Sequence, residues 1–227
     1  MQNIKVAVDA VVFGYKDEQL FLLCIKQKFG PLKGHWVLPG GLVKDKERLQ
    51  EAVIRELLEE TNVEVEYLEQ LYTFGDTLDR DPRGRVITVT YLGLVNPEGL
   101  KIKAATDAMD AKWFSVEKLP SLGFDHNEIV AKGLERLRSK VHYEPIGFDL
   151  LNPIFYMAEL EGLYRTLTRR DFDRRNFRRK ILRLGLLEDL GIFSSPGKGR
   201  PANKYRFIEQ RFKELQEEGF QFEIKFS

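Results

Sequence analysis

Residues 41–63 read GLVKDKERLQEAVIRELLEETNV, and this stretch carries a fixed-spacing pattern of polar residues. The specified positions are Gly41, Glu47, Arg55, Glu56, Glu59 and Glu60. Because each residue type occurs at a frequency of roughly 7%, such a pattern matches by accident on the order of 10⁻⁷ times per starting point. Chance therefore does not explain it.

The spacing has a physical meaning if residues 47–61 form a helix. Glu56 then lies beside Glu59 and Glu60, at i+3 and i+4 on one face. Three like charges there oppose the helix by roughly 0.2–0.5 kcal/mol per pair unless a cation lies among them. A hard divalent ion with oxygen ligands, Mg²⁺ or Mn²⁺, meets that demand. The competing interpretation is an acidic helix face that is only solvated.

The segment resembles the signature of Nudix hydrolases, which is glycine, five residues, glutamate, seven residues, then arginine-glutamate-aliphatic-any-glutamate-glutamate-any-glycine-aliphatic. One position departs from it, because Asn62 replaces the second glycine. Asparagine tolerates the left-handed conformation that ends many helices, so we expect the helix to stop there as usual.

The resemblance implies a role for each specified residue. The metal-binding and catalytic residues would be Glu56, Glu59 and Glu60, with the Gly41 carbonyl assisting the metal. Glu47 would pair with Arg55 and hold the loop against the helix. The cofactor would be Mg²⁺ or Mn²⁺.

Composition places the chain among ordinary proteins with a packed core. Its 227 residues suffice for one large or two smaller domains, and 43% are hydrophobic while 31% are charged. No run approaches 18 apolar residues, so we expect no membrane span. The N-terminus lacks a signal-peptide layout, and the single cysteine, Cys24, reads as a buried thiol. We therefore expect a cytoplasmic protein.

The net charge of +1 conceals a segregation of charge along the chain. Residues 165–206 contain thirteen Lys and Arg against four Asp and Glu, a local excess of +9. The remainder must then carry −8. Such asymmetry indicates an acidic half that binds a metal or metabolite and a basic half that binds polyanions, with nucleic acid as the leading partner.

Strand patterns dominate the first hundred residues. We predict strands at 4–13, 20–27, 35–38, 63–74, 86–95 and 111–115, and helices at 47–61 and 125–140. This order predicts an α/β fold with a mixed sheet and helices on its faces. The Nudix resemblance, which covers roughly residues 1–140, implies the same α/β/α sandwich. We assign residues 1–143 to this ligand-binding or hydrolase domain.

The pattern changes after residues 142–151, which contain an X-Pro step and a glycine and read as the inter-domain connector. Helices are predicted at 157–167 and from 174 to about 184, with Asp173 as the N-cap of the second. A short apolar turn at 185–187, a glycine-rich basic hairpin at 194–201 and a strand at 204–208 follow. That order is typical of a winged helix-turn-helix, so we assign residues 144–227 to a DNA-binding domain.

The second of these helices begins RRNFRRKIL at Arg174. We expect a buried stripe of Phe177, Ile181, Leu182 and Leu184, with the arginines mainly outward. Arginine is bidentate to guanine and asparagine to adenine, so the helix suits the major groove. The candidate DNA-binding residues are Arg174, Arg175, Asn176, Arg178, Arg179 and Lys180 on the helix, and Lys198, Arg200 and Lys204 on the wing. A solvated face or an RNA-binding surface is the alternative.

This half also resembles a specific family. RRNFRRKIL followed by GKGRPANKYRF is similar to the C-terminal domain of Nudix-related transcriptional regulators, over about residues 145–210. The family includes bacterial repressors of NAD metabolism and regulators of sugar use. The resemblance implies that the Nudix half senses ADP-ribose or a sugar and that the winged helix binds double-stranded operator DNA as a homodimer.

Two short segments of the first half resemble the same family, residues 80–85 (RDPRGR) and 124–126 (FDH). Arg80, Arg83 and Arg85 are candidate ligand-binding residues, since guanidinium matches a diphosphate bidentately. A solvent-exposed turn is the alternative. For His126 we favour a capping and packing role over catalysis.

Together these observations predict a DNA-binding transcriptional regulator whose Nudix-like domain senses a nucleotide-sugar or sugar metabolite, with an ADP-ribose-like molecule favoured. All carboxylates of the motif are intact, so Mg²⁺-dependent hydrolysis stays open. The alternative is an active Nudix hydrolase that cleaves nucleoside diphosphate-linked substrates such as ADP-ribose.

Overall fold

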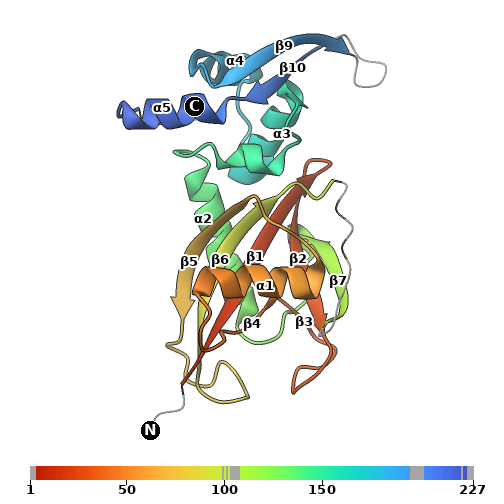
Figure 1. Ribbon diagram of the computed structural model, residues 1–227. Helices are drawn as coiled ribbons and strands as arrows, with labels where there is room; N and C mark the ends of the chain where they lie inside the picture. The colour runs from red at the N-terminus through yellow and green to blue at the C-terminus, as the bar shows by residue number, and fades with distance from the viewer. Residues whose placement is uncertain are drawn as a thin grey trace. The chain divides into compact units, whose positions relative to one another are not determined.

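Strands β1 (Lys5–Lys16) and β2 (Gln19–Gln27) lie at the centre of a mixed sheet (Figure 1). The computed structural model describes residues 4–98, 100, 102, 108–194, 202–220 and 222–223. The other strands of the sheet are β3 (Trp36–Val37), β4 (Gly40–Leu42), β5 (Tyr67–Phe74), β6 (Val86–Val95) and β7 (Ala108–Ser115). The order is β3-β2-β1-β6-β5, with β4 paired to β1 and β7 to β2. The β1–β6 pair is parallel, whereas β3, β4, β5 and β7 pair antiparallel.

Helices α1 (Leu49–Thr61) and α2 (His126–Lys140) cover the two faces of this sheet. Successive residues of β1 point to opposite faces. Val8 and Val12 belong to the same apolar cluster as Val53 of α1. On the other face Val11 lies so close to α2 that a Cβ added at Gly133 would be 2.8 Å from its Cγ1. Figure 1 shows α1 in front of the sheet and α2 behind it, which confirms the predicted sandwich.

Helix α1 ends where the sequence predicts. Ala52, Val53 and Leu57 are buried, as expected for its inward face. Asn62 has φ 57° and ψ 32°, the left-handed conformation expected of a residue in this position, and its N–H bonds to the Leu58 carbonyl at 3.1 Å. The departure from glycine in the motif therefore leaves the helix stop intact.

Several strands differ from the prediction, and two of these differences have a clear local cause. β4 was not predicted, and it forms because Gly40–Leu42 pairs with Ala7–Asp9 of β1. β5 begins at Tyr67 and not at Val63. The N–H of Val63 bonds to the Thr61 hydroxyl at 3.2 Å, so it closes the end of α1 and does not join the sheet.

The C-terminal unit is a small winged-helix fold, as predicted. Its elements are a short 3₁₀ helix (Ile146–Leu150), β8 (Phe155–Tyr156), α3 (Met157–Thr168), α4 (Arg174–Arg183), β9 (Leu187–Ser194), β10 (Ala202–Phe207) and α5 (Glu209–Glu217). The strand order is β8-β10-β9, all antiparallel. The division between the two units falls between Arg136 and Leu137, within α2, and the Asp17–Gln19 turn belongs to the C-terminal unit.

Aromatic side chains form much of the C-terminal core. Tyr164 of α3 packs against Phe177 of α4 with ring centroids 5.2 Å apart. Phe148 of the 3₁₀ helix stacks on Phe207 of β10 at 4.2 Å. The segment predicted as the connector thus contributes to this core, where Leu150 is fully buried.

Three expectations for this unit were wrong or incomplete. A strand, β9, begins at Leu187, where only a short turn was expected before the hairpin, because it pairs with β10. Helix α5 was not predicted. Leu182 was placed in the buried stripe of α4 but is 42% exposed, since it lies 100° around the helix from buried Ile181. None of the helices in the described part of the chain is long and apolar enough to cross a lipid bilayer.

Candidate functional site

The guanidinium of Arg55 lies among the carboxylates of the acidic motif. Its Nη2 donates to Glu47 Oε2 at 2.9 Å, and its Nη1 donates to Glu56 Oε1 at 2.7 Å and to Glu59 Oε2 at 3.2 Å. Nη2 also lies 3.3 Å from the Leu42 carbonyl, which ties the preceding loop to α1. The hydrogen bond from Arg55 is the largest cause that lowers the pKa of Glu47 to about 2. Arg55 thus supplies the positive charge that this acidic helix face requires.

Glu60 of the same motif is buried and bonds elsewhere. Its Oε2 accepts a hydrogen bond from the Gly40 N–H at 2.9 Å. Glu56 packs against the neighbouring glycine, so that a Cβ at Gly41 would lie 2.3 Å from Glu56 Oε1. Burial raises the pKa of Glu56, and the bonded Arg55 opposes that rise.

In this arrangement the three glutamates do not converge on one point. Among the residues that the structure describes, no three His, Cys, Asp or Glu side chains are placed to hold a metal ion together. The donor set nevertheless consists of carboxylates and backbone carbonyls, which suit a hard divalent cation. The missing Cβ of Gly41 also leaves room for the carboxylate of Glu56 beside the loop.

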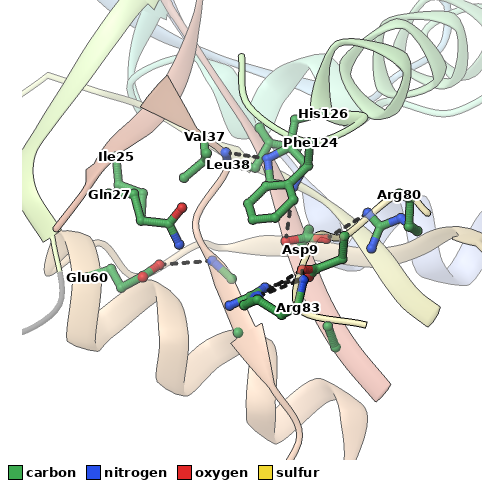
Figure 2. Close-up of a pocket in the computed structure, with 14 residues that line it drawn as sticks. Asp9, Ile25, Gln27, Val37, Leu38, Glu60, Arg80, Arg83, Phe124 and His126 are labelled. Carbon is green, nitrogen blue, oxygen red and sulfur yellow. Dashed lines mark hydrogen bonds and ion pairs between the residues drawn. The ribbon is translucent and has the colours of Figure 1, made fainter. Parts of the chain in front are cut away.

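A pocket opens next to Glu60 (Figure 2). Its walls come from β1, β2, β3, β4 and the end of α1, and from the 75–85 loop and the start of α2. Its polar and aromatic lining consists of Asp9, Gln27, Glu60, Arg80, Asp81, Arg83, Phe124 and His126. The predicted segments RDPRGR and FDH therefore meet the acidic motif at one site, although they are far apart in the sequence.

A buried polar cluster forms the floor of this pocket. Arg80 donates to both oxygens of Asp125, from Nε at 2.7 Å and from Nη2 at 2.6 Å. Its Nη2 also lies 3.9 Å from Asp9, which is 3.7 Å from Nε2 of His126. The N–H of Leu38 donates to His126 Nδ1 at 2.8 Å. Arg80 is buried and forms two hydrogen bonds to Asp125, so the alternative interpretation of this residue as part of a solvent-exposed turn is wrong. The buried position of His126 fits the packing role expected of it.

Arg83 lies at the surface of the pocket. Its Nε and Nη2 donate to Asp81 at 2.9 and 2.7 Å, and its guanidinium carbon lies 5.3 Å from the centre of the Phe124 ring. Burial tends to raise the pKa of Asp81, but the bonded Arg83 outweighs it and the pKa is lowered. Among the described residues the Nη1 group of Arg83 has no hydrogen-bond partner, so it can bind an anionic ligand.

Two further residues differ from the prediction. Arg85 does not line the pocket, and its Nη1 lies 3.5 Å from the Thr77 carbonyl. Gln27, which the sequence analysis did not single out, lines the pocket with a buried side-chain oxygen that has no hydrogen-bond partner among the described residues. Such an atom is poised to bind a ligand.

The burial of His126 predicts a loss of stability in mild acid. Burial lowers its pKa most, nearby Asp9 and Asp125 oppose that shift, and Arg80 adds to it. Because the folded pKa is below the ordinary 6.5, the unfolded chain binds the proton first. The free energy of unfolding should therefore be constant above pH 6.5 and fall below it, with a slope of at most about 1.4 kcal/mol per pH unit for this group.

Urea unfolding between pH 5 and 7.5 tests this expectation. His126→Asn is the matched control, because its side-chain oxygen can still accept from Leu38 but does not titrate. The variant should show a flatter pH dependence than the wild type over this range. Identical slopes in both proteins would contradict the assignment.

Helix α4 carries the arginines predicted to bind DNA, and Asp173 caps it as expected, accepting from the Asn176 N–H at 2.7 Å. Two of the arginines bond to one buried carboxylate on α3. Arg174 Nε donates to Glu161 Oε2 at 2.8 Å, and Arg178 Nη2 donates to Glu161 Oε1 at 3.2 Å. Both side chains stay more than half exposed, in keeping with the predicted outward placement, but each is also tied to α3.

The remaining candidates lie in different surroundings. Arg175 and Arg179 are exposed, and Arg179 Nη2 donates to Asn176 Oδ1 at 2.9 Å. Lys180 is half-buried on the same helix. Lys204 of β10 places its ammonium 5.1 Å from the Tyr156 ring centre. Lys198 and Arg200 fall outside the residues that the structure describes.

Known proteins resemble both units. Residues 3–134 match the NUDIX domain family, and residues 147–207 match the NrtR DNA-binding winged helix domain. The ADPR responsive transcriptional repressor NtrR of Acinetobacter baylyi is 32% identical over 209 residues, which cover 90% of this chain and 82% of the relative. The ADP-ribose pyrophosphatase of Methanocaldococcus jannaschii is 40% identical over 125 residues, 55% of this chain and 70% of the enzyme.

Solved structures agree with both sequence matches. Shewanella oneidensis NrtR complexed with a 27mer DNA has a TM-score of 0.80 at 30% identity, covering 97% of this chain and 99% of that one. The NUDIX domain of the same protein complexed with ADP ribose has a TM-score of 0.55 at 36% identity, covering 60% of this chain and 90% of that one. With a NUDIX domain over more than half of its length and an NrtR winged helix after it, the chain belongs to the NrtR family.

Proposed function

We propose that the chain is a transcriptional repressor that binds ADP-ribose in the pocket beside Glu60 and operator DNA through its winged helix. The observation that carries this proposal is the exposed arginine face of α4, in the same chain as a pocket that offers a guanidinium, an aromatic ring and an amide. A hydrolase has no use for such a helix. The A. baylyi relative is a repressor that responds to ADPR, and it matches both units.

The pocket residues suit the parts of a nucleoside diphosphate sugar. Arg83 would contact the diphosphate, since a guanidinium matches phosphate oxygens bidentately. Phe124 would stack on the base or cover the apolar face of a sugar. Gln27 would bond a hydroxyl or an exocyclic amine with its unpartnered oxygen. Arg80, which is already bonded to Asp125, would position the 75–85 loop and not touch the ligand.

A divalent cation, Mg²⁺ or Mn²⁺, is the cofactor we propose for this site. Glu56, Glu59, Glu60 and the Gly41 carbonyl would hold it, with Arg55 remaining on Glu47. When bound, such an ion neutralises a diphosphate and lowers the pKa of a coordinated water. The residues of the chain itself orient the ligand through Arg83 and Gln27 and anchor the loop through the Glu60–Gly40 bond.

The DNA-binding side of the proposal includes a homodimer. Operators with two half-sites one helical turn apart are read by two recognition helices related by a two-fold axis. We place the repressor in the cytoplasm, together with the operator DNA that it is proposed to bind. The mass of the purified chain by light scattering tests the dimer.

Linked binding experiments test the regulator. A duplex selected from a random pool by the wild-type chain is titrated with and without ADP-ribose, and ADP-ribose is titrated with and without that duplex. Thermodynamic linkage requires both affinities to change by the same factor. The proposal fails if the chain enriches no duplex, or if saturating ADP-ribose leaves duplex affinity unchanged.

Retained hydrolysis is the second candidate function. It is favoured by the intact carboxylates of the motif and by the 40% identity to an ADP-ribose pyrophosphatase. The reaction adds one water across the diphosphate and yields AMP and ribose 5-phosphate. One carboxylate beside the pocket would accept the proton of that water.

Replacing Glu59 and Glu60 together by glutamine should separate the two functions. We expect any Mg²⁺-dependent release of AMP to fall by at least about 100-fold, because two anionic oxygens are lost from the proposed metal site. Duplex binding without ligand should be unchanged. Glutamine at position 60 can still accept from Gly40, so the loop keeps its anchor. Glu51→Gln, an exposed carboxylate on the same helix, is the control. An unchanged rate in the double variant would contradict the assignment of these glutamates.

A further inference from the structure

Helix α4 presents its arginines on two different faces. Phe177 and Ile181 are buried, and a helix turns by 100° per residue. Arg174 and Arg178 are therefore next to the buried stripe. Arg175 lies on the opposite, exposed side together with the residues four and eight positions later. Those residues are Arg179 and Arg183, and both are exposed.

A buried glutamate holds the first pair. The side chain of Glu161 on α3 is only 2% exposed, and it accepts from Arg174 Nε and Arg178 Nη2 at 2.8 and 3.2 Å. A carboxylate removed from water is tolerated only when charged or hydrogen-bonding partners compensate it. These two guanidinium groups are that compensation, and they link α4 to α3.

The second group, Arg175, Arg179 and Arg183, has no carboxylate partner among the described residues. Within the described parts of the chain, neither Arg175 nor Arg183 forms an ion pair or a side-chain hydrogen bond. Among the residues that the structure describes, Arg179 bonds only to the neutral side chain of Asn176, which orients its guanidinium without cancelling its charge. Three full positive charges therefore lie on one exposed strip of the helix, each four residues from the next.

We infer that Arg175, Arg179 and Arg183 form the DNA-contacting strip of α4, whereas Arg174 and Arg178 are positioning residues tied to Glu161. This inference rests on the proposed DNA-binding function and says which arginines of α4 contact DNA and which position the helix. It adds Arg183, which the sequence analysis passed over, and removes two arginines from direct contact. A guanidinium strip of this kind fits phosphates along one groove edge and the O6 and N7 atoms of guanine.

Two variants matched in charge and spacing test the division. R175Q/R179Q and R174Q/R178Q each remove two positive charges from the same helix at an i, i+4 spacing. The probe is the duplex selected by the wild-type chain, with a scrambled duplex of equal length beside it. We expect R175Q/R179Q to lose at least about 100-fold in affinity for the selected duplex, because two guanidinium contacts are lost. R174Q/R178Q should lose less than about 10-fold.

The second variant leaves Glu161 buried without its partners and can misfold. The triple variant E161Q/R174Q/R178Q removes that unpaired charge and is measured beside it. It should bind the selected duplex within about 10-fold of the wild type. R183Q alone should weaken binding by roughly 10-fold and lower the salt dependence by about one counterion, as expected of a phosphate contact.

The outcomes separate this inference from the proposed function. If the wild type enriches no duplex, the DNA-binding function itself fails. If the wild type binds but the folded triple variant loses as much affinity as R175Q/R179Q, the division of roles is overturned. An R183Q variant with wild-type affinity and salt dependence removes Arg183 from the strip. Circular dichroism confirms the fold of each variant before binding is measured.

Discussion

Gly40→Ala is expected to lower the free energy of unfolding of the N-terminal unit by about 3 kcal/mol or more. A Cβ at this position would lie 2.2 Å from the Val8 carbonyl oxygen and 2.9 Å from the Asp9 Cα. Both are backbone atoms of β1, the strand that pairs with β4 here and with β6 on its other side. They cannot move without disturbing the centre of the sheet.

Gly41→Ala is the matched comparison, with a different expected result. Its Cβ would meet the carboxylate of Glu56, 2.3 Å away, which is the end of a flexible side chain. We expect a stability loss below about 1 kcal/mol, together with weaker binding of Mg²⁺ and ADP-ribose because Glu56 is displaced.

Urea unfolding followed by tryptophan fluorescence distinguishes the two glycines. Both tryptophans, Trp36 and Trp113, belong to the N-terminal unit, so their signal reports on that unit alone. Equal stability of the two variants would contradict the prediction, because the close contact between a Cβ at position 40 and the Val8 carbonyl should cost stability only in Gly40→Ala.

Replacing Arg174 and Arg178 by glutamine should destabilise the C-terminal unit by about 3 kcal/mol, the lower end of the range for breaking a buried ion pair. The loss arises because Glu161, whose side chain is 2% exposed, is left without a cationic partner. The lower end is chosen because the two guanidinium groups are 63% and 53% exposed, so water already weakens each pair.

Glu161→Gln should have a much smaller effect, below about 1.5 kcal/mol. The arginines it releases are already more than half in water, and the neutral amide can still accept one hydrogen bond. The triple variant should recover most of the stability lost in the arginine pair. Circular dichroism at 222 nm reports on the helices of both units, and tryptophan fluorescence reports on the N-terminal unit alone. A transition seen only by circular dichroism therefore belongs to the C-terminal unit. If the stability losses of Glu161→Gln and of the arginine pair simply added in the triple variant, that result would contradict the buried ion pair.

Local sequence signals predicted most of the fold because they depend on neighbours along the chain. The continuous apolar run of β1 and the apolar face of α1 can be recognised in the sequence, and both were confirmed. Asp173 at the start of α4 and Asn62 at the end of α1 identified helix ends by their side-chain chemistry. β4 and β9 were missed because a short or polar strand is stabilised mainly by pairing with another strand, which the local sequence does not show.

The pocket could be predicted only in part. The acidic motif and the RDPRGR and FDH segments were found as separate pieces, and the structure places them around one cavity. Asp9 could have been noticed as a lone charge in an apolar strand. Gln27 gave no signal, because a glutamine at the end of a strand is ordinary until the ligand pocket forms beside it.

Glu161, like Asp9, could have been noticed as a lone charge among apolar residues. It stands on the helical face that also carries Met157 and Tyr164, where a charge is unusual. Its partners, however, lie on another helix, and the sequence does not show which arginines of α4 face α3.

The sequence by itself determined the elements, the acidic motif and the basic character of α4, because periodicity, capping and residue type act over a few neighbouring positions. Only the tertiary structure decided which guanidinium groups are held by Asp125 and Glu161 and which remain open to a ligand or to DNA. A charge is cancelled by whatever lies within hydrogen-bonding distance in space, and that distance is set by the packing of residues remote from one another in the chain.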